Sequence, residues 1–298
     1  MSEAVEIPAG TLTVTQPIGV QFAWRRAIPW LLTGPLLLFM LAFYAVPVVS
    51  MLLRSVNDPT WTLAHFYALT SDTVFFKVFS NTLYTAFTVT IGTLLLGYPL
   101  ALALVRTPRW APVILIMILL PFWTSVLVRS YAWMVLMGRH GLINEALLAL
   151  GMIERPWRIL NTPLATQIAM IHILLPYMVL PITNALRQID PSLPRASSGL
   201  GATPWGTFRQ ITLPLSMSGV AAGMLLVFVL ALGFYITPAM LGGPREITLS
   251  MLIDLQVDQL NWAYAATLSV VLLATTLAII GLFYRLPGVS NAFRMGAR

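Results

Sequence analysis

The residues able to perform covalent or metal chemistry are few in this chain and widely separated. The single lysine, Lys77, follows Phe76, so the chain has no Gly-Lys-Ser/Thr phosphate-binding loop. The three histidines, His65, His140 and His172, lack the spacing of metal ligands such as HExxH. There are no cysteines and no Gly-x-Ser-x-Gly motif. We therefore expect no catalytic residue, no metal site and no cofactor bound by this chain.

One charged residue, Arg129, lies inside an otherwise apolar stretch. A charge within a membrane-spanning segment is costly and by default marks function. Two interpretations remain open. The side chain extends to the membrane surface from near the outer end of its span, or it pairs with a carboxylate at the outer mouth of a pathway. Asp254 and Asp258 are the candidates, because residues four apart share one helix face; a solvated outer face is the alternative explanation for these acids.

Aromatic side chains are the second class of residue that could contact a solute. Cationic amines bind aromatic faces, especially beside carboxylates. A Trp or Tyr near the end of a span is otherwise an anchor at the membrane surface, and Trp133 and Trp262 fit that description. The candidate solute pathway comprises Trp123, Arg129, Tyr131, Tyr235, Asp254 and Asp258.

The elements that must position these residues are membrane helices. Hydrophobic residues make up 58% of the 298 residues and charged residues only 9%, against about 25% charged in soluble domains. So few charges cannot cover a surface in water, whereas lipid accepts apolar side chains. The net charge of +7 indicates loops that face anionic lipid rather than nucleic acid.

Six stretches contain the roughly 20 apolar residues that a membrane-spanning helix needs. Five of them carry no Asp, Glu, Lys or Arg, and one contains only Arg129. They are residues 30–53, 78–105, 113–137, 163–186, 211–241 and 262–284. The sequence thus predicts an all-α integral membrane protein with six transmembrane helices. This domain spans residues 30–286, between tails formed by residues 1–29 and 287–298.

The distribution of basic residues predicts the orientation. With a cytoplasmic N-terminus, ten of the 17 basic residues fall on the cytoplasmic side and six on the outer side, with Arg129 inside its span. Cytoplasmic loops carry an excess of Lys and Arg. We therefore expect both tails to lie in the cytoplasm.

Residues 187–214, which connect the fourth and fifth spans, carry the most specific pattern. Asp190 and Thr203 each precede a proline, which is typical of a helix start. Gly201, between them, can adopt the left-handed conformation that ends a helix. Pro214 is expected to break the chain again before the fifth span. The loop is therefore predicted to form two short helices around a small-residue elbow, which either docks another protein or lies on lipid headgroups.

This loop resembles the EAA loop of ABC importer permeases. The matching residues are Ala196, Leu200, Gly201, Ala202, Pro204, Trp205 and Phe208. In that family the loop forms a coupling helix seated in a groove of the ATPase subunit. The usual Glu-Ala-Ala start is replaced here by Arg195, Ala196 and Ser197. Because this glutamate is replaced, its charge contact with the ATPase is not expected here. The packing of the elbow against the ATPase is still expected.

Further segments are similar to spermidine/putrescine-type permeases of the B-like subunit. They are residues 121–125, 128–133, 141–144, 233–243 and 261–266. The resemblance implies a type I ABC importer permease (MetI-like) fold in a bacterial inner membrane. It also implies half of a translocation pore, completed by a second homologous permease. Two ATPase subunits that hold ATP and Mg and a periplasmic solute-binding protein are the further partners, and no nucleic acid is involved.

The solute implied is a polyamine such as spermidine or putrescine, or a related organic cation or amino-acid derivative. A secondary, ion-coupled transporter that acts without an ATPase is the alternative function, and a membrane-embedded enzyme is the third. A carrier should place ionisable residues near the bilayer midplane, often within inverted repeats. The charge-free span centres and the structured loop favour the ATP-driven permease subunit.

Overall fold

The computed structural model describes residues 33–57, 60–244 and 246–285. The predicted tails, residues 1–29 and 287–298, lie outside the described residues. The described part consists of helices and their connections, with one isolated bridge between Asn57 and Trp61. The predicted all-α class is confirmed.

The first of two compact units ends at Leu53, and its described part is one apolar helix, Thr33–Leu53, long enough to cross a membrane. A π-helical segment, η1 (Leu41–Ala45), precedes α2 (Val46–Leu53). It ends two residues before Pro47. Proline lacks an N–H, and its ring clashes with the carbonyl four residues earlier, so a locally wider turn relieves the crowding.

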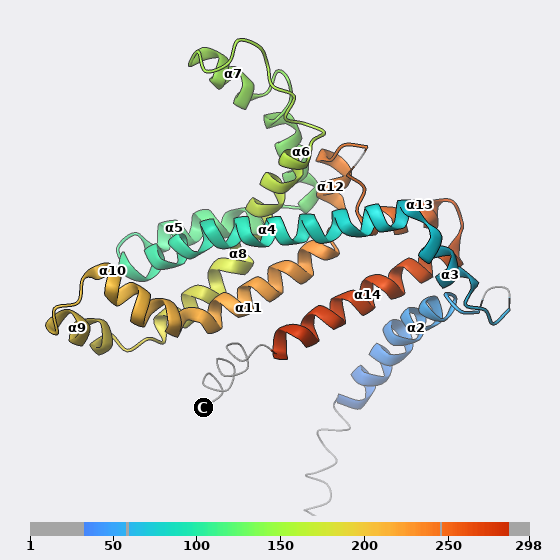
Figure 1. Cartoon of the computed structure of the whole chain (residues 1–298), viewed down its shortest axis with the longest axis horizontal. Helices are drawn as coiled ribbons and strands as arrows, with labels where there is room; N and C mark the ends of the chain where they lie inside the picture. The colour runs from blue at the N-terminus through green and yellow to red at the C-terminus, as the bar shows by residue number, and fades with distance from the viewer. Residues whose placement is uncertain (1–32, 58–59, 245, 286–298) are drawn as a thin grey trace, which may run out of the picture. The chain divides into compact units, whose positions relative to one another are not determined.

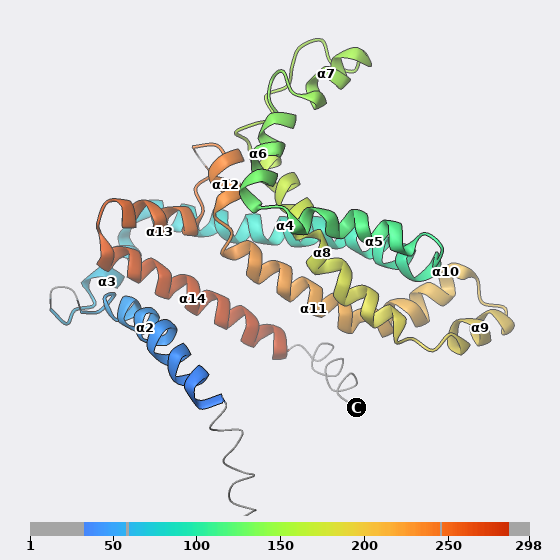
Figure 2. The ribbon, with the colours of Figure 1, turned by 180° about the vertical axis from the view of Figure 1, so that it is seen from behind.

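The second unit begins at Arg54. Its described helices are α3 (Ala64–Ser71), α4 (Thr73–Arg106), α5 (Ala111–Leu119), α6 (Val126–Leu136), α7 (Leu142–Ala149), α8 (Pro163–Arg187), α9 (Ser192–Gly199), α10 (Pro204–Thr207), α11 (Leu213–Leu232), α12 (Ile236–Leu241), α13 (Leu249–Asp258) and α14 (Trp262–Arg285). Figures 1 and 2 show α9 and α10 at one end of the bundle and α3 and α13 at the other.

The predicted third span, residues 113–137, is not one straight helix. α5 and α6 are separated by the 3₁₀ turn η2 (Leu120–Trp123) and meet at 104°. Pro121 lies in this turn, and the Ser125 hydroxyl caps the new helix by accepting a hydrogen bond from the Leu127 N–H at 3.3 Å. A proline followed by a capping serine therefore breaks a stretch whose composition alone suits a continuous span.

The predicted fifth span, residues 211–241, begins and ends earlier than expected. One apolar helix runs over Pro204–Leu232, joining α10, the π-helical segment η3 (Phe208–Thr212) and α11. The expected break at Pro214 is wrong, because the π-helical segment ends two residues before it and widens the turn, as it does near the N-terminus of the described chain. The helix instead ends at Gly233, and the short α12 follows.

α8 forms the centre of the core, packed against α4 and α11. Met170, Leu174, Met178 and Ile182 recur every fourth residue and are at most 1% exposed. Residues at this spacing lie on one helix face. The buried apolar side chains of α4 and α11 close over the same face.

Two glycines of α11 allow the closest approach to α8. A Cβ atom on Gly219 would lie 2.5 Å from the carbonyl oxygen of Pro181 and 2.6 Å from the Cβ atom of Ala185. One on Gly223 would lie 2.9 Å from the sulfur of Met178. Small residues four apart let helix backbones meet closely in membranes. This Gly-x-x-x-Gly pair therefore sets the α8–α11 distance.

At the other end of the bundle, hydrogen bonds hold α13 and the segment before it to α4. The Leu249 N–H donates to Thr82 Oγ1 at 2.8 Å, and Asn81 Nδ2 donates to the carbonyl of Ile247 at 3.2 Å. These contacts fix the start of α13 against the membrane bundle.

Replacing Gly219 with alanine tests the close approach. Gly219→Ala should destabilise the folded protein by about 1–3 kcal/mol, because the new methyl group meets backbone that cannot rotate away. Gly281→Ala on α14, where no atom lies within 4 Å of an added Cβ, is the matched control and should stabilise by about 0.5–1 kcal/mol. Thermal unfolding in detergent measures both changes. Equal midpoints for the two variants would contradict the packing.

Candidate functional site

The loop between α8 and α11 forms the two predicted helices. The Asp190 carboxylate accepts a hydrogen bond from the Ser192 N–H at 2.8 Å at the start of α9. That backbone N–H lowers the pKa of Asp190, with smaller contributions from the Ser192 hydroxyl and from Arg195. The acid therefore stays ionised at the start of the helix, where negative charge is favourable.

A left-handed residue ends α9, as predicted. Gly201 has φ of 85°. Its N–H donates to the Ser198 carbonyl and the Ala202 N–H donates to the Ser197 carbonyl, both at 3.1 Å. This pair of bonds is the Schellman motif. It closes α9 and turns the chain sharply toward α10.

The second piece of the loop is fixed to the first piece and to the bundle. Thr203 Oγ1 accepts a hydrogen bond from the Gly206 N–H at 3.1 Å and caps α10. The hydroxyls of Ser197 and Thr207 lie 2.9 Å apart and join the two pieces.

A row of aromatic rings leads from the loop to α4. The rings of Trp205 and Phe208 stack with centroids 5.3 Å apart, and Phe208 meets the edge of Tyr98 at 5.9 Å. The Tyr98 hydroxyl lies 2.9 Å from Ser216 Oγ on α11. Trp205 and Phe208 were predicted from the sequence, but Tyr98 was not, because it is 110 residues before Phe208 and shows no local pattern.

Apolar side chains of the elbow are exposed. Leu200 is 89% exposed and Trp205 is 69% exposed. Pro204, Arg195 and Ala196 are also exposed. A rigid loop with projecting apolar side chains has the character of a docking surface. The predicted coupling residues thus occupy one elbow, which runs from α9 through α10 to the start of η3.

A polar cluster occupies the interface of α6 and α8. The Trp133 indole Nε1 donates to Nδ1 of His172 at 3.3 Å. His172 and Tyr177 both lie within electrostatic range of the Arg129 guanidinium. The Trp133–His172 contact lies beside the middle of the 25-residue α8, while the position of Arg129 near the outer end of its span stays a prediction.

The suggested pairing of Arg129 with Asp254 or Asp258 is not formed. Nε of Arg129 is buried without a hydrogen-bond partner within the described part of the chain. Asp254 instead accepts a hydrogen bond from the Tyr235 hydroxyl at 2.6 Å. The structure therefore brings together two of the pathway candidates, Tyr235 and Asp254, in a contact between the α12 start and α13.

A buried hydrogen bond links α6 to α12. The hydroxyls of Ser130 and Thr237 lie 2.8 Å apart, and both residues are fully buried. The bond places the helix that carries Arg129 beside the helix that begins after Tyr235. Trp123 and Tyr131, the other pathway candidates, are 78% and 58% exposed.

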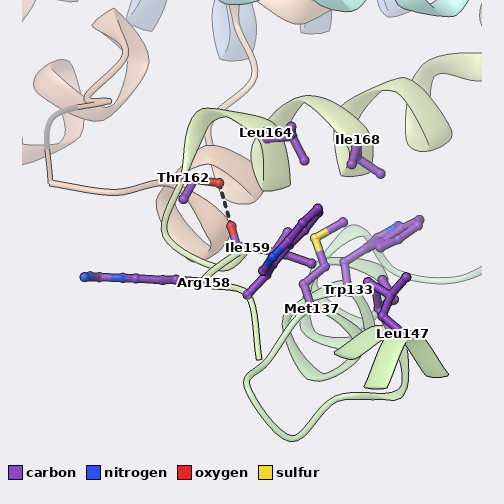
Figure 3. Close-up of a pocket in the computed structure, with 10 residues that line it drawn as sticks. Trp133, Met137, Leu147, Arg158, Ile159, Thr162, Leu164 and Ile168 are labelled. Atoms are coloured by element: carbon purple, nitrogen blue, oxygen red, sulfur yellow. Dashed lines mark hydrogen bonds between the residues drawn. The ribbon is translucent and has the colours of Figure 1, made fainter. Parts of the chain in front are cut away.

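The pocket in Figure 3 lies between α6, α7 and the start of α8, and its volume is about 710 Å³. Its walls are formed mainly by apolar side chains, among them Met137, Leu147 and Ile168, while Arg158 extends away from them. Solute sites need a few placed polar groups. This pocket does not offer the carboxylates that a cationic solute requires.

No group of three or more His, Cys, Asp or Glu side chains in the described ranges could hold a metal ion. The candidate site therefore consists of the exposed elbow and of separate polar and charged side chains.

The sequence profile of one family matches residues 96–286, and its description is "Binding-protein-dependent transport system inner membrane component". The spermidine/putrescine transport system permease protein PotB of Escherichia coli (strain K12) is 34% identical over 227 residues, covering 76% of this chain and 82% of that protein. PotB of Haemophilus influenzae is 31% identical over 266 residues, covering 86% and 93%. The inner membrane ABC transporter permease protein YdcU of Escherichia coli (strain K12) is 33% identical over 238 residues, covering 74% and 76%.

The fold is similar to that of a solved bacterial ABC transporter involved in the import of the acidic polysaccharide alginate. The TM-score is 0.74 at 19% identity, with coverage of 89% of this chain and 99% of that chain. This likeness supports the MetI-like fold. Together with the profile match and the PotB relatives, it shows that the chain belongs to the binding-protein-dependent inner membrane permeases and is a multi-pass permease subunit of an ABC importer, with the ATPase on a separate subunit.

Proposed function

We propose that this chain forms half of the translocation pore of an importer for a small organic solute. A second homologous permease supplies the other half. Two ATPase subunits bind ATP and Mg, and a periplasmic binding protein delivers the solute. The observation that carries the proposal is the rigid elbow with its exposed Leu200 and Trp205.

The elbow is connected to the core helices, so a movement of the ATPase would be transmitted to them. Its first piece follows α8, and its second piece is continuous with α11 through Pro204–Leu232. Phe208 and Tyr98 connect it to α4. A load applied to Leu200 or Trp205 therefore acts on three core helices at once.

The loop is assigned to the cytoplasmic side. The support is the excess of basic residues, ten against six, on the side that would hold this loop and both termini. The same assignment places α13, with Asp254 and Asp258, on the periplasmic side.

The solute is proposed to be a polyamine such as spermidine or putrescine, or a related organic cation or amino-acid derivative. The PotB relatives support the polyamine class. Tyr235 and Asp254 suit an amine, because an aromatic ring and a carboxylate both attract cations. A relative at 29% identity is a molybdenum transport system permease from Mycobacterium bovis, so the shared fold does not by itself select the solute.

Substitution of Gly201 tests the coupling role of the elbow. Gly201→Trp should prevent co-purification of the ATPase, because a bulky side chain at φ of 85° strains the turn and displaces Leu200. Gly151→Trp is the matched control, since Gly151 also has positive φ and open space around it but lies in the loop after α7. An intact ATPase complex and normal transport in Gly201→Trp would count against the elbow as the docking site.

Reconstitution distinguishes the permease from an ion-coupled carrier. Liposomes holding this chain and its second permease without the ATPase should show no uptake of labelled putrescine or spermidine above protein-free liposomes. Adding the ATPase, ATP and the binding protein should start solute uptake. Uptake driven by a proton or sodium gradient alone would overturn the ATP-driven mechanism.

A further inference from the structure

One face of α9 is polar and carries a single arginine. Arg195 is exposed, and so are Ser192, Ser198 and Gly199, which lie within about 60° of it around the helix. The helix contains no acidic residue. The positive charge of Arg195 therefore lies at the centre of this face.

This polar face is turned away from the rest of the elbow. Ser197 follows Arg195 by two residues, which places it about 200° around the helix, on the opposite side. Its hydroxyl lies 2.9 Å from that of Thr207, the last residue of α10. Since Thr207 is buried and Ser197 is half-buried, α9 packs on α10 through this opposite side. Arg195 consequently lies on the outer side of the elbow.

The charge of Arg195 is not balanced within the elbow. The only acid in residues 187–214 is Asp190, whose carboxylate accepts the Ser192 N–H at 2.8 Å. Asp190 and Arg195 interact through their electric field but form no ion pair within the described part of the chain. Three arginines against one acid leave residues 187–214 with a net charge of +2. Negative charge on a partner would complement this surface.

The other two arginines of the loop are placed for lipid. Arg187 is the last residue of α8, and Arg209 lies in the continuous apolar helix Pro204–Leu232. Basic side chains near the ends of membrane helices extend to the headgroups. Arg195 is instead in the separate helix α9, on the side opposite to the segment that leads into the membrane. A protein surface therefore fits Arg195 better than lipid does.

Arg195 is within reach of a protein that binds the exposed apolar residues of the elbow. Leu200 follows it by five residues, about 8 Å along a helix. A specific protein contact covers about 800 Å² on each partner, which is far more than one leucine side chain offers. An ATPase surface that covers Leu200 therefore extends over Arg195.

We propose that the ATPase subunit places an Asp or Glu against Arg195, so that the elbow docks on an acidic patch of the ATPase. This inference rests on the proposed docking of the elbow and adds the charge that the ATPase carries there. An arginine binds a carboxylate through two parallel hydrogen bonds. The pair therefore fixes the orientation of α9 on the ATPase as well as attracting it.

Crosslinking tests the pairing directly. Arg195→Lys supplies a primary amine in a Lys77→Arg background, which removes the only other lysine. A water-soluble carbodiimide activates a carboxylate, and the amine displaces the urea to form an amide bond. Peptide mass spectrometry of the assembled importer should find residue 195 joined to an Asp or Glu of the ATPase. Arg195→Gln in the same background should give no such product.

Charge substitution gives the energetic test, with the importer's ATPase binding to the permeases in phosphatidylcholine nanodiscs. Arg195→Gln should weaken binding about 5-fold, as loss of an exposed ion pair does. Arg195→Glu should weaken it on the order of 100-fold, because two carboxylates then face each other. Arg209→Glu, an equal charge change on an exposed residue of the same loop, is the matched control and should leave binding unchanged.

Three results would overturn the pairing. They are an amide only to Asp190 of this chain, equal weakening by Arg195→Glu and Arg209→Glu, and weakening by Arg195→Glu that appears only when the nanodiscs also contain phosphatidylglycerol. The last result would assign Arg195 to anionic lipid. Failure of the unsubstituted chain to bind any ATPase would instead contradict the proposed importer itself.

Discussion

Close contact between α8 and α11 joins the membrane bundle to the elbow that projects from it. Gly219 and Gly223 remove the side chains that would otherwise separate the two backbones, and dispersion contacts then act over the full length of the buried α8 face. The same two helices carry the elbow, one at each end of the loop. Since interiors this tightly packed transmit displacement rather than absorb it, we expect the bundle to respond to a load on the elbow as one body.

The local backbone differs between three prolines, and with it whether the helix continues or breaks. π-helical segments precede Pro47 and Pro214 and keep each helix continuous. Pro121 has no such segment and instead lies in a 3₁₀ turn that ends the first half of a broken span. Broken spans often line transport pathways. The break here brings Trp133 to the middle of α8 and places α6 beside α12.

Much of this organisation follows from local sequence signals. Apolar length predicts the continuous spans, and the Asp190, Thr203 and Gly201 signals predict the elbow with its caps and its left-handed stop. The prediction of a continuous third span was wrong, because apolar composition does not reveal a turn made by one proline and one capping serine. The contact of Trp133 with His172 was not predicted, because it depends on the α6–α8 packing, which has no local signature.

The other contacts that were not predicted from the sequence join residues that are far apart in the chain. Tyr98 and Phe208 are far apart in sequence, as are Trp133 and His172. The Gly-x-x-x-Gly pair can be seen in the sequence and was overlooked. The sequence does not show which residues of α8 it packs against. Asp254, a predicted pathway residue, accepts a hydrogen bond from Tyr235 and does not form the suggested pair with Arg129. The pathway residues therefore stay predictions, while the elbow now has a defined geometry.

The elbow is proposed to deliver the force of a separate ATPase to the membrane helices. The chain contains no cysteine, so Leu200→Cys creates a single thiol at the most projecting apolar position. A thiol-linked photo-crosslinker at this site should join the chain to the ATPase subunit in the intact importer, and a membrane-impermeant thiol reagent applied from the periplasm should not reach it. Labelling from the periplasmic side, or crosslinks confined to lipid, would contradict the account.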